Sequence, residues 1–321
     1  MISIAGLSYV WYHVWMNIEQ TLGDEQVREL LSRGIAYDAP ATLSRLMDKL
    51  GFSMKKRFGQ NFMVSPHARA QIITLAGPVK DRVVWEIGPG FGALTNLLLG
   101  KAALVRAFEI DFGFIRVLRI LFGDRPDFVL VEGDALRTWK PAWDEDAAQG
   151  GPAAIIGNLP YNVGSAIIAD ILEAGCIAPR MVFTVQKEVA ERMASIPGNP
   201  DYSSFSIHCQ ARCRVSIEAS LKPTCFWPQP EVNSAVVVLE PRKVSLPITN
   251  QELFGVLVRS SFAARRKTLE NNCKSSSLAA TVGMDRMTAG AESAGISLKA
   301  RGETLSAEDF ARWANAISAT A

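Results

Sequence analysis

The 321-residue chain carries almost no net charge, since 34 Lys and Arg residues oppose 32 Asp and Glu residues for a formal charge of +2. This balance excludes a protein that holds nucleic acid through its overall charge, so any RNA-binding face must come from local clusters of basic residues. The composition is 48% hydrophobic and 21% charged, which excludes global disorder and suffices for one large domain plus a smaller one.

Cysteine is also scarce, and its pattern excludes the usual zinc sites. The five cysteines form no CxxC pair and no zinc-like spacing: Cys176, Cys209, Cys213, Cys225 and Cys273. We therefore expect reduced, mostly buried thiols in a cytoplasmic protein, and no metal site. The apolar stretch at residues 1–16 lacks the basic start and the cleavage site of a signal peptide and is short for a membrane span. Our hypothesis for this stretch is that translation begins downstream, at Met16 or later.

From residue 82 onward, apolar runs alternate with amphipathic stretches at the pace of β-α-β units. The nearly continuous apolar character of the runs is typical of a parallel sheet covered on both faces. Two later runs predict an added antiparallel pair, and polar, Gly-rich residues predict a loop at 144–152. The predicted strands are residues 82–87, 104–109, 128–132, 153–157, 181–185, 215–221 and 234–239, and the predicted helices between them are 93–99, 112–122, 165–173 and 187–194.

After Pro241 no strand pattern remains, and helical patterns such as residues 252–262 and 307–316 take over. The sequence thus predicts an α/β fold with a Rossmann-like domain, which has a doubly wound, mostly parallel sheet with an added antiparallel pair, plus a small α-helical C-terminal domain. We divide the chain into an N-terminal extension of unknown role, a cofactor-binding domain and a helical domain, at residues 1–45, 46–245 and 246–321.

A Gly-rich turn, Glu86-Ile87-Gly88-Pro89-Gly90-Phe91-Gly92, ends the first predicted strand of this domain. Its glycines permit a tight turn and a close approach to a ligand. At the ends of the next two strands, Glu109 is placed to accept both hydroxyls of a ribose, and Asp134 to accept an adenine amine. The G-x-G-x-G spacing and the lack of an oxidoreductase-type acid/base pair favour S-adenosylmethionine over a dinucleotide.

The fourth strand is followed by Asn158-Leu159-Pro160-Tyr161. The Asn158 side-chain oxygen and the Leu159 carbonyl can accept the two N–H hydrogens of an adenine amine, so that its lone pair faces an incoming methyl group. Pro160 stiffens the turn before substrate arrives, and Tyr161 can stack on the base. Phe226, in a Pro-rich loop, is the candidate for the opposite face of the base. This interpretation predicts a methyltransferase that acts on an adenine amine in RNA and needs no general base.

Seven motifs together resemble one family over most of the chain, from about Gly51 to near its C-terminus. They are KKRFGQNF at residues 55–62, EIGPGFG at 86–92, GDAL at 133–136, NLPYN at 158–162, VQKEVA at 185–190, PQPEVNS at 228–234 and FAARRKTLENN at 262–272. On these motifs the chain resembles the KsgA (RsmA) family of small-subunit ribosomal RNA adenine dimethyltransferases.

This resemblance implies which residues contact the cofactor, S-adenosylmethionine, and the RNA. The cofactor contacts would be Asn61, Met63, Gly88, Glu109, Asp134 and Asn158, to which we add Gly90 of the same glycine turn. The family usually has Leu where Met63 stands, an apolar replacement. The phosphate contacts would come from two basic clusters, Lys55-Lys56-Arg57 and Arg265-Arg266-Lys267, although part of the second cluster can instead brace the domain interface.

The resemblance also implies the substrate: two adjacent adenines in a hairpin loop near the 3′ end of 16S ribosomal RNA. Each adenine would receive two methyl groups, and the reaction would have a role in small-subunit biogenesis. We expect the protein to be a monomer and to have no membrane partner. Three alternatives remain open. They are a macrolide-resistance type of methyltransferase that modifies large-subunit RNA, an assembly or transcription-related binding protein without turnover, and a small-molecule methyltransferase.

Overall fold

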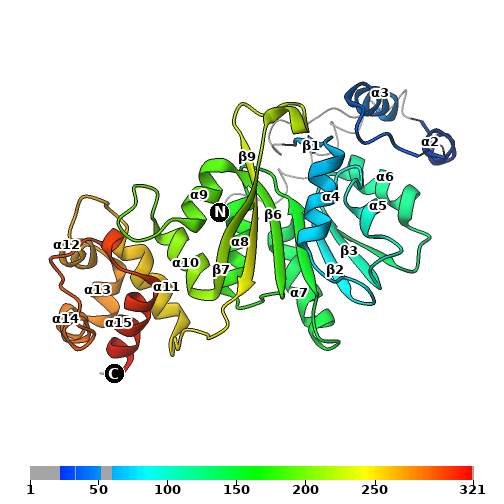
Figure 1. The fold of residues 1–321 in the computed structure, drawn as a ribbon. Helices are drawn as coiled ribbons and strands as arrows, with labels where there is room; N and C mark the ends of the chain where they lie inside the picture. Colours follow the sequence, from blue (N-terminus) through cyan, green and yellow to red (C-terminus); the bar gives the residue numbers. More distant parts are fainter. Residues whose placement is uncertain (1–21, 33, 52–59, 320–321) are drawn as a thin grey trace, which may run out of the picture.

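Seven strands form the central sheet in the order β4-β3-β2-β5-β6-β9-β7 (Figure 1). The computed structural model describes residues 22–32, 34–51 and 60–319. The strands from β2 to β6 pair in parallel, whereas β9 pairs antiparallel with both β6 and β7. This arrangement confirms the mostly parallel sheet with an added antiparallel pair. The strands are β2 (Val83–Ile87), β3 (Leu104–Glu109), β4 (Phe128–Glu132), β5 (Ala154–Asn158), β6 (Arg180–Gln186), β7 (Cys213–Leu221) and β9 (Ser234–Pro241).

Helices cover both faces of the sheet, because successive side chains of each buried strand point to opposite sides. In β2, Trp85 packs with Trp139 in one buried cluster, whereas Val84 packs with Leu98 in another. The doubly wound architecture is thereby confirmed. The helices of the first face are α7 (Ala135–Ala147), α8 (Gly164–Glu173), α9 (Lys187–Ala194) and α10 (Ser204–Arg212), and those of the second are α4 (Pro66–Leu75), α5 (Thr95–Leu98) and α6 (Phe112–Phe122).

One predicted loop is partly helical in the structure. Helix α7 runs to Ala147, so the loop predicted at residues 144–152 is wrong over its first four residues. Asp146, 3% exposed, accepts hydrogen bonds from Trp85 Nε1 at 2.6 Å and from Arg106 Nη2 at 2.8 Å. This buried charge pair joins segments far apart in the sequence, which is why the local polar composition did not reveal the helix.

The N-terminal extension contributes two helices, α2 (Asp24–Leu31) and α3 (Pro40–Leu50), at the end of the molecule opposite the C-terminus (Figure 1). Their apolar residues form one buried cluster with Phe91 and Phe114. The cluster joins the extension to the glycine turn and to α6. The proposed start at Met16 lies outside the described residues.

Two short strands form a separate antiparallel pair beside this cluster: β1 (Phe62–Met63) and β8 (Phe226–Trp227). Their register pairs Met63 with Phe226. The 3-10 helix η2 (Pro223–Cys225) precedes β8. The pair therefore ties the end of the KKRFGQNF motif to the Pro-rich segment.

Helices alone follow β9 in the described part of the chain, as predicted. They are α11 (Gln251–Ser261), α12 (Leu269–Lys274), α13 (Ser277–Val282), α14 (Met284–Ser293), η3 (Gly302–Thr304) and α15 (Ala307–Ala319). Their shared core includes Trp313 and also Tyr202 and Ile207, which come from the segment around α10. The division of the chain at residues 45 and 245 stays a prediction. No described helix combines the length and the apolar character needed to cross a membrane.

Candidate active site at the carboxyl edge of the sheet

A cavity of about 820 Å³ opens at the carboxyl ends of β2, β3, β4 and β5. This is the edge at which open parallel sheets bind ligands. The cavity brings together residues that the sequence places as far apart as β1 and α8. Among its lining residues are the predicted Asn61, Met63, Gly88, Gly90, Glu109, Asp134, Asn158, Leu159, Pro160 and Tyr161.

The glycine turn after β2 needs its glycines for conformation and for space. Gly88, Gly90 and Gly92 have φ angles of +72°, +57° and +81°, in the left-handed region that side chains disfavour. A Cβ atom on Gly90 would lie 3.1 Å from the Phe62 ring, and one on Gly88 would lie 3.8 Å from the Asn158 carbonyl oxygen. The turn therefore lies directly against β1 on one side and the Asn158 turn on the other.

Glu109, at the end of β3, is a buried carboxylate held by three backbone N–H groups. Its Oε2 accepts from Gly90 at 3.0 Å, and its Oε1 accepts from Ile110 and Asp111, each at 2.9 Å. Burial raises the pKa of Glu109 to about 7, although the three N–H donors act in the opposite direction. The carboxylate is therefore fixed in orientation and titrates near neutral pH.

Glu86 is a second acid in the cavity wall, and the sequence analysis did not assign it a role. It is 1% exposed, and its Oε2 accepts a hydrogen bond of 2.5 Å from Thr95 Oγ1. Burial raises its pKa to about 8, so the group is mainly neutral at pH 7. The sequence did contain a signal for this residue, because Glu86 is an acid within an otherwise apolar strand.

Asp134 caps the N-terminus of α7, where its Oδ1 accepts from the Leu136 backbone N–H at 3.0 Å. The cap fixes the carboxylate and leaves Oδ2 for a ligand. Asp134 follows β4, Glu109 ends β3, and Asn158 ends β5, so the three side chains stand in a row along one edge of the sheet.

Asn158 is held by its amide nitrogen: Nδ2 donates to the Asn61 carbonyl oxygen at 2.6 Å. This bond leaves the Oδ1 end of the side chain for a ligand. The neighbouring peptide is also fixed, because the Leu159 N–H donates to the Thr184 carbonyl oxygen at 3.2 Å and the Leu159 side chain is buried. The Asn158 Oδ1 acceptor is therefore oriented by the surrounding fold, and Leu159 is anchored beside it through its own N–H and its side chain.

Tyr161 is partly buried at the cavity wall, and its hydroxyl lies 2.5 Å from the Ser234 Oγ of β9. The contact joins the Asn158 turn to the PQPEVNS motif. Phe226, in contrast, does not line the cavity. Its ring is 2% exposed and lies in the buried cluster on the face of the sheet that α4, α5 and α6 cover. The prediction that Phe226 lies opposite Tyr161 across the base is therefore not met in this structure.

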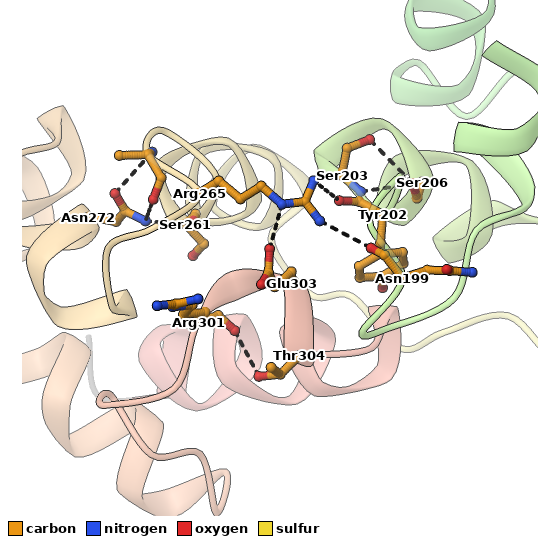
Figure 2. A network of polar contacts seen from close by, with 11 residues as sticks. Asn199, Tyr202, Ser203, Ser206, Ser261, Arg265, Asn272, Arg301, Glu303 and Thr304 are labelled. Atoms are coloured by element: carbon orange, nitrogen blue, oxygen red, sulfur yellow. Dashed lines mark hydrogen bonds and ion pairs between the residues drawn. The ribbon is translucent and has the colours of Figure 1, made fainter. Parts of the chain in front are cut away.

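The two predicted RNA-binding clusters have different outcomes. Lys55, Lys56 and Arg57 lie outside the described residues. Arg265 stays exposed but is held by protein contacts, as Figure 2 shows: its Nε pairs with Glu303 at 2.7 Å and its Nη2 donates to the Asn199 carbonyl oxygen at 3.1 Å.

The other two residues of the second cluster, Arg266 and Lys267, are exposed and make no ion pair with any described residue. Because Arg265 is held by the contacts of Figure 2, it braces the helical group against the segment before α10, the alternative role foreseen for part of this cluster. Among residues 22–32, 34–51 and 60–319, no group of three or more His, Cys, Asp or Glu side chains gathers closely enough to hold a metal ion.

Comparisons with known sequences point to one family. The family model for ribosomal RNA adenine dimethylase matches residues 51–319. The ribosomal RNA small subunit methyltransferase A of Treponema denticola is 41% identical over 276 residues, which cover 85% of this chain and 93% of that protein. The protein of the same name from Clostridium perfringens is 38% identical over 273 residues, with coverage of 85% and 93%. The crystal structure of a dimethyladenosine transferase from Plasmodium falciparum superimposes with a TM-score of 0.63 at 26% identity, over 78% of this chain and 94% of that one.

Proposed function

Because the chain belongs to the ribosomal RNA adenine dimethylase family, we propose that its cavity binds S-adenosylmethionine and that its Asn158 turn presents adenine amines of small-subunit ribosomal RNA for dimethylation. The observation that carries the proposal is the anchored amide of Asn158. Its nitrogen is bonded to the Asn61 carbonyl, so its oxygen is available beside the cavity.

The dimensions and the lining of the cavity support S-adenosylmethionine as its ligand. Neighbouring strands of a sheet lie about 4.8 Å apart, so the edge from β4 to β5 spans roughly 14 Å, the length of an extended nucleoside with an amino-acid tail. We assign the adenine end to Asp134 and the ribose hydroxyls to Glu109. Gly88 and Gly90 allow the backbone to approach the ligand closely, and Asn61 and Met63 border the same space. The bound cofactor supplies a methyl group activated by a positive sulfur.

Asn158 and Leu159 act on the substrate amine, whose lone pair is normally delocalised into the adenine ring. When the Asn158 Oδ1 and the Leu159 carbonyl oxygen accept its two N–H hydrogens, electron density stays on the nitrogen. Because the Asn61 carbonyl already holds the Asn158 side chain and the Thr184 carbonyl anchors the Leu159 N–H beside it, little reorganisation is needed when substrate arrives. Tyr161 supplies a face for stacking, which is worth about 1–3 kcal/mol per base.

Dimethylation sets a condition on this site. After the first transfer the amine has a single N–H left, so only one of the two acceptors, Asn158 or Leu159, can remain bonded to it. The monomethyl product must therefore turn its methyl group aside within the cavity for the second transfer.

We propose as substrate the two adjacent adenines of the hairpin loop near the 3′ end of 16S ribosomal RNA. Both relatives described above carry a small-subunit name, which supports this choice over large-subunit RNA. Bases in a hairpin loop are already partly unstacked, so extruding one requires less energy than in a duplex. A ribosomal substrate also favours a cytoplasmic location. We propose that the protein acts as a monomer and has a role in small-subunit biogenesis.

The proposal is tested by incubating the protein with isotopically labelled S-adenosylmethionine and unmethylated 30S subunits, then mapping the labelled adenines. We expect two adjacent dimethyladenosines near the 3′ end of 16S RNA. Labelling confined to large-subunit RNA, or no transfer at all, would reject the proposed substrate.

Glu109 predicts a pH dependence of cofactor binding. The ribose hydroxyls donate to its carboxylate, whose pKa in the free protein is about 7. Below pH 7 the proton must leave before the ligand binds, so the affinity for S-adenosylhomocysteine should fall up to about tenfold per pH unit between pH 7 and 5. Isothermal titration calorimetry across this range measures the effect.

The Glu109→Gln variant is the matched control for this titration. It should bind S-adenosylhomocysteine more weakly and with little pH dependence. Glu86, whose pKa is about 8, and Asp111 also face this carboxylate, and Glu86→Gln removes the first of their contributions. If the affinity of the unmodified protein stays constant from pH 5 to 8, the role of Glu109 is contradicted.

The stability of the protein should change with pH in the opposite direction to its affinity for the ligand. The folded state holds the Glu109 proton more tightly than the unfolded state does. The Glu109 contribution to the free energy of unfolding therefore falls as pH rises from about 4.5 to about 7.

The second basic cluster predicts a separation between binding and stability. Arg266→Ala and Lys267→Ala should each weaken RNA binding. Each should also reduce the slope of log affinity against log salt concentration by about one for the lost phosphate contact. The melting temperature should stay unchanged. Arg265→Ala should lower the free energy of unfolding by on the order of 1 kcal/mol, since it loses the Glu303 pair and the Asn199 bond. Salt titrations of RNA affinity and urea unfolding distinguish the two classes, and equal effects of all three variants would refute the distinction.

A further inference from the structure

The N-terminal extension reaches into the cofactor cavity. Tyr37, in the turn before α3, and Leu43, in α3 itself, both line it, although they precede the family-matched segment that begins at residue 51. The sequence analysis left this part of the chain without a role. Its contact with the cavity shows that the site is built from the extension as well as from the sheet.

The ring of Tyr37 is held in place from beneath. Arg69 lies against it, with the guanidinium carbon 5.8 Å from the ring centroid. Arg69 is 8% exposed and is itself fixed, because its Nη1 donates to the Met63 carbonyl oxygen at 2.9 Å. Leu43 belongs to the buried cluster that ties α3 to Phe91 of the glycine turn. The position of Tyr37 is therefore coupled to β1 and to the turn that approaches the cofactor.

The hydroxyl of Tyr37 has no hydrogen-bond partner among the described residues. Burial raises the pKa of Tyr37, and the Glu86 carboxyl raises it further, so the hydroxyl stays protonated and acts as a donor. A half-buried donor that borders a cavity and lacks a protein partner is suited to an acceptor on a ligand. Through Arg69, which bonds the Met63 carbonyl, Tyr37 lies near β1, whose neighbour Asn61 accepts from Asn158.

The order of strands indicates which part of the ligand this donor would meet. Asp134 follows β4 and Glu109 ends β3, so in the proposed function adenine and ribose would take the first half of the sheet edge. The other half of the cofactor, with the sulfur and the amino-acid tail, would then lie between β2 and Asn158. Arg69 adds positive charge beside Tyr37, and Asp38 lies near Arg69 on the outer side of the same turn.

We infer that Tyr37 is a cofactor-binding residue whose hydroxyl donates to the α-carboxylate of S-adenosylmethionine. The inference rests on the proposed function, because it requires that this cavity bind that cofactor. It assigns the N-terminal extension a function: it completes the wall of the cavity around the amino-acid end of the ligand.

The test compares two ligands that share adenosine and a thioether but differ in the amino-acid tail: S-adenosylhomocysteine and 5′-methylthioadenosine. Their dissociation constants are measured by isothermal titration calorimetry for the full chain, for Tyr37→Phe and for Asp134→Asn. Tyr37→Phe keeps the ring over Arg69 and should weaken S-adenosylhomocysteine about tenfold while leaving 5′-methylthioadenosine unchanged. Asp134→Asn, at the adenine end, should weaken both ligands.

Two results would overturn the inference: an unchanged affinity of Tyr37→Phe for S-adenosylhomocysteine, or an equal loss for both ligands. The melting temperature of Tyr37→Phe, expected to match that of the parent protein, separates a lost contact from a damaged fold. Failure of the parent protein to bind either ligand would reject the proposed function itself, and with it the inference. The two failures are thus distinguishable.

Discussion

Asn158→Ala is expected to lower the rate of methyl transfer by about 10²–10³-fold, because it removes a pre-oriented acceptor from the amine. Tyr161 and the basic side chains remain, so RNA affinity should stay within about twofold of the parent value. Single-turnover assays with labelled S-adenosylmethionine and 30S subunits measure the transfer step, and filter binding measures RNA affinity.

Asn158→Asp is the matched control. It keeps acceptor oxygens at the same position but loses the Nδ2 donor that bonds the Asn61 carbonyl. It should therefore retain more transfer than Asn158→Ala, although less than the parent protein. An alanine variant with full activity would refute the acceptor role, and an alanine variant that loses RNA binding would show that Asn158 holds substrate rather than activates it.

Gly157→Ala is expected to damage the same site without removing any polar group. A Cβ atom at this position would lie 2.6 Å from the Ile87 backbone oxygen and 3.0 Å from Leu159 Cδ2. Because β2 and β5 are paired up to Glu86 and Ile156, directly before this position, the end of β5 must move and take Asn158 with it. We expect a loss of about 1–3 kcal/mol in the free energy of unfolding and, since small displacements of reacting groups are costly, a transfer rate about 10²-fold lower.

Gly100→Ala is the control for this variant. Gly100 has a φ angle of +76°, but an added Cβ would meet nothing within 4 Å, so it tests backbone strain alone. It should lose about 1 kcal/mol of stability and no transfer activity. Urea unfolding and single-turnover assays compare the two variants. A Gly157→Ala protein with the parent rate would show that the site tolerates displacement of β5.

The central sheet was predictable because its strands are buried on both faces and therefore read as apolar runs. The same runs located Glu109, Asp134 and Asn158 at strand ends, and the strand order then placed them in one row. Contacts between distant segments could not be predicted in this way. The end of α7 depends on the ion pair between Asp146 and Arg106, which no local pattern reveals.

The site residues that the sequence analysis missed or misplaced have a common physical reason. Tyr37 lines the cavity from the turn before α3, a helix that packs with Phe91, and Glu86 becomes notable only once its burial is known. Phe226 was assigned to the substrate site because it lies in a Pro-rich segment. In the structure it belongs to β8, which pairs with β1, and its ring is buried. Arg265 shares a basic cluster with Arg266, yet it forms an ion pair with Glu303 of the helical group. In each case tertiary packing, and not residue type, decided the outcome.

The most direct measurement is a structure of the protein with S-adenosylhomocysteine and an RNA hairpin that presents the target adenines. The account predicts that the adenine amine lies within about 3.2 Å of both Asn158 Oδ1 and the Leu159 carbonyl oxygen, with the ligand sulfur on the far side of the nitrogen. An amine directed away from both oxygens, with the Asn158 side chain bonded only within the protein, would contradict it.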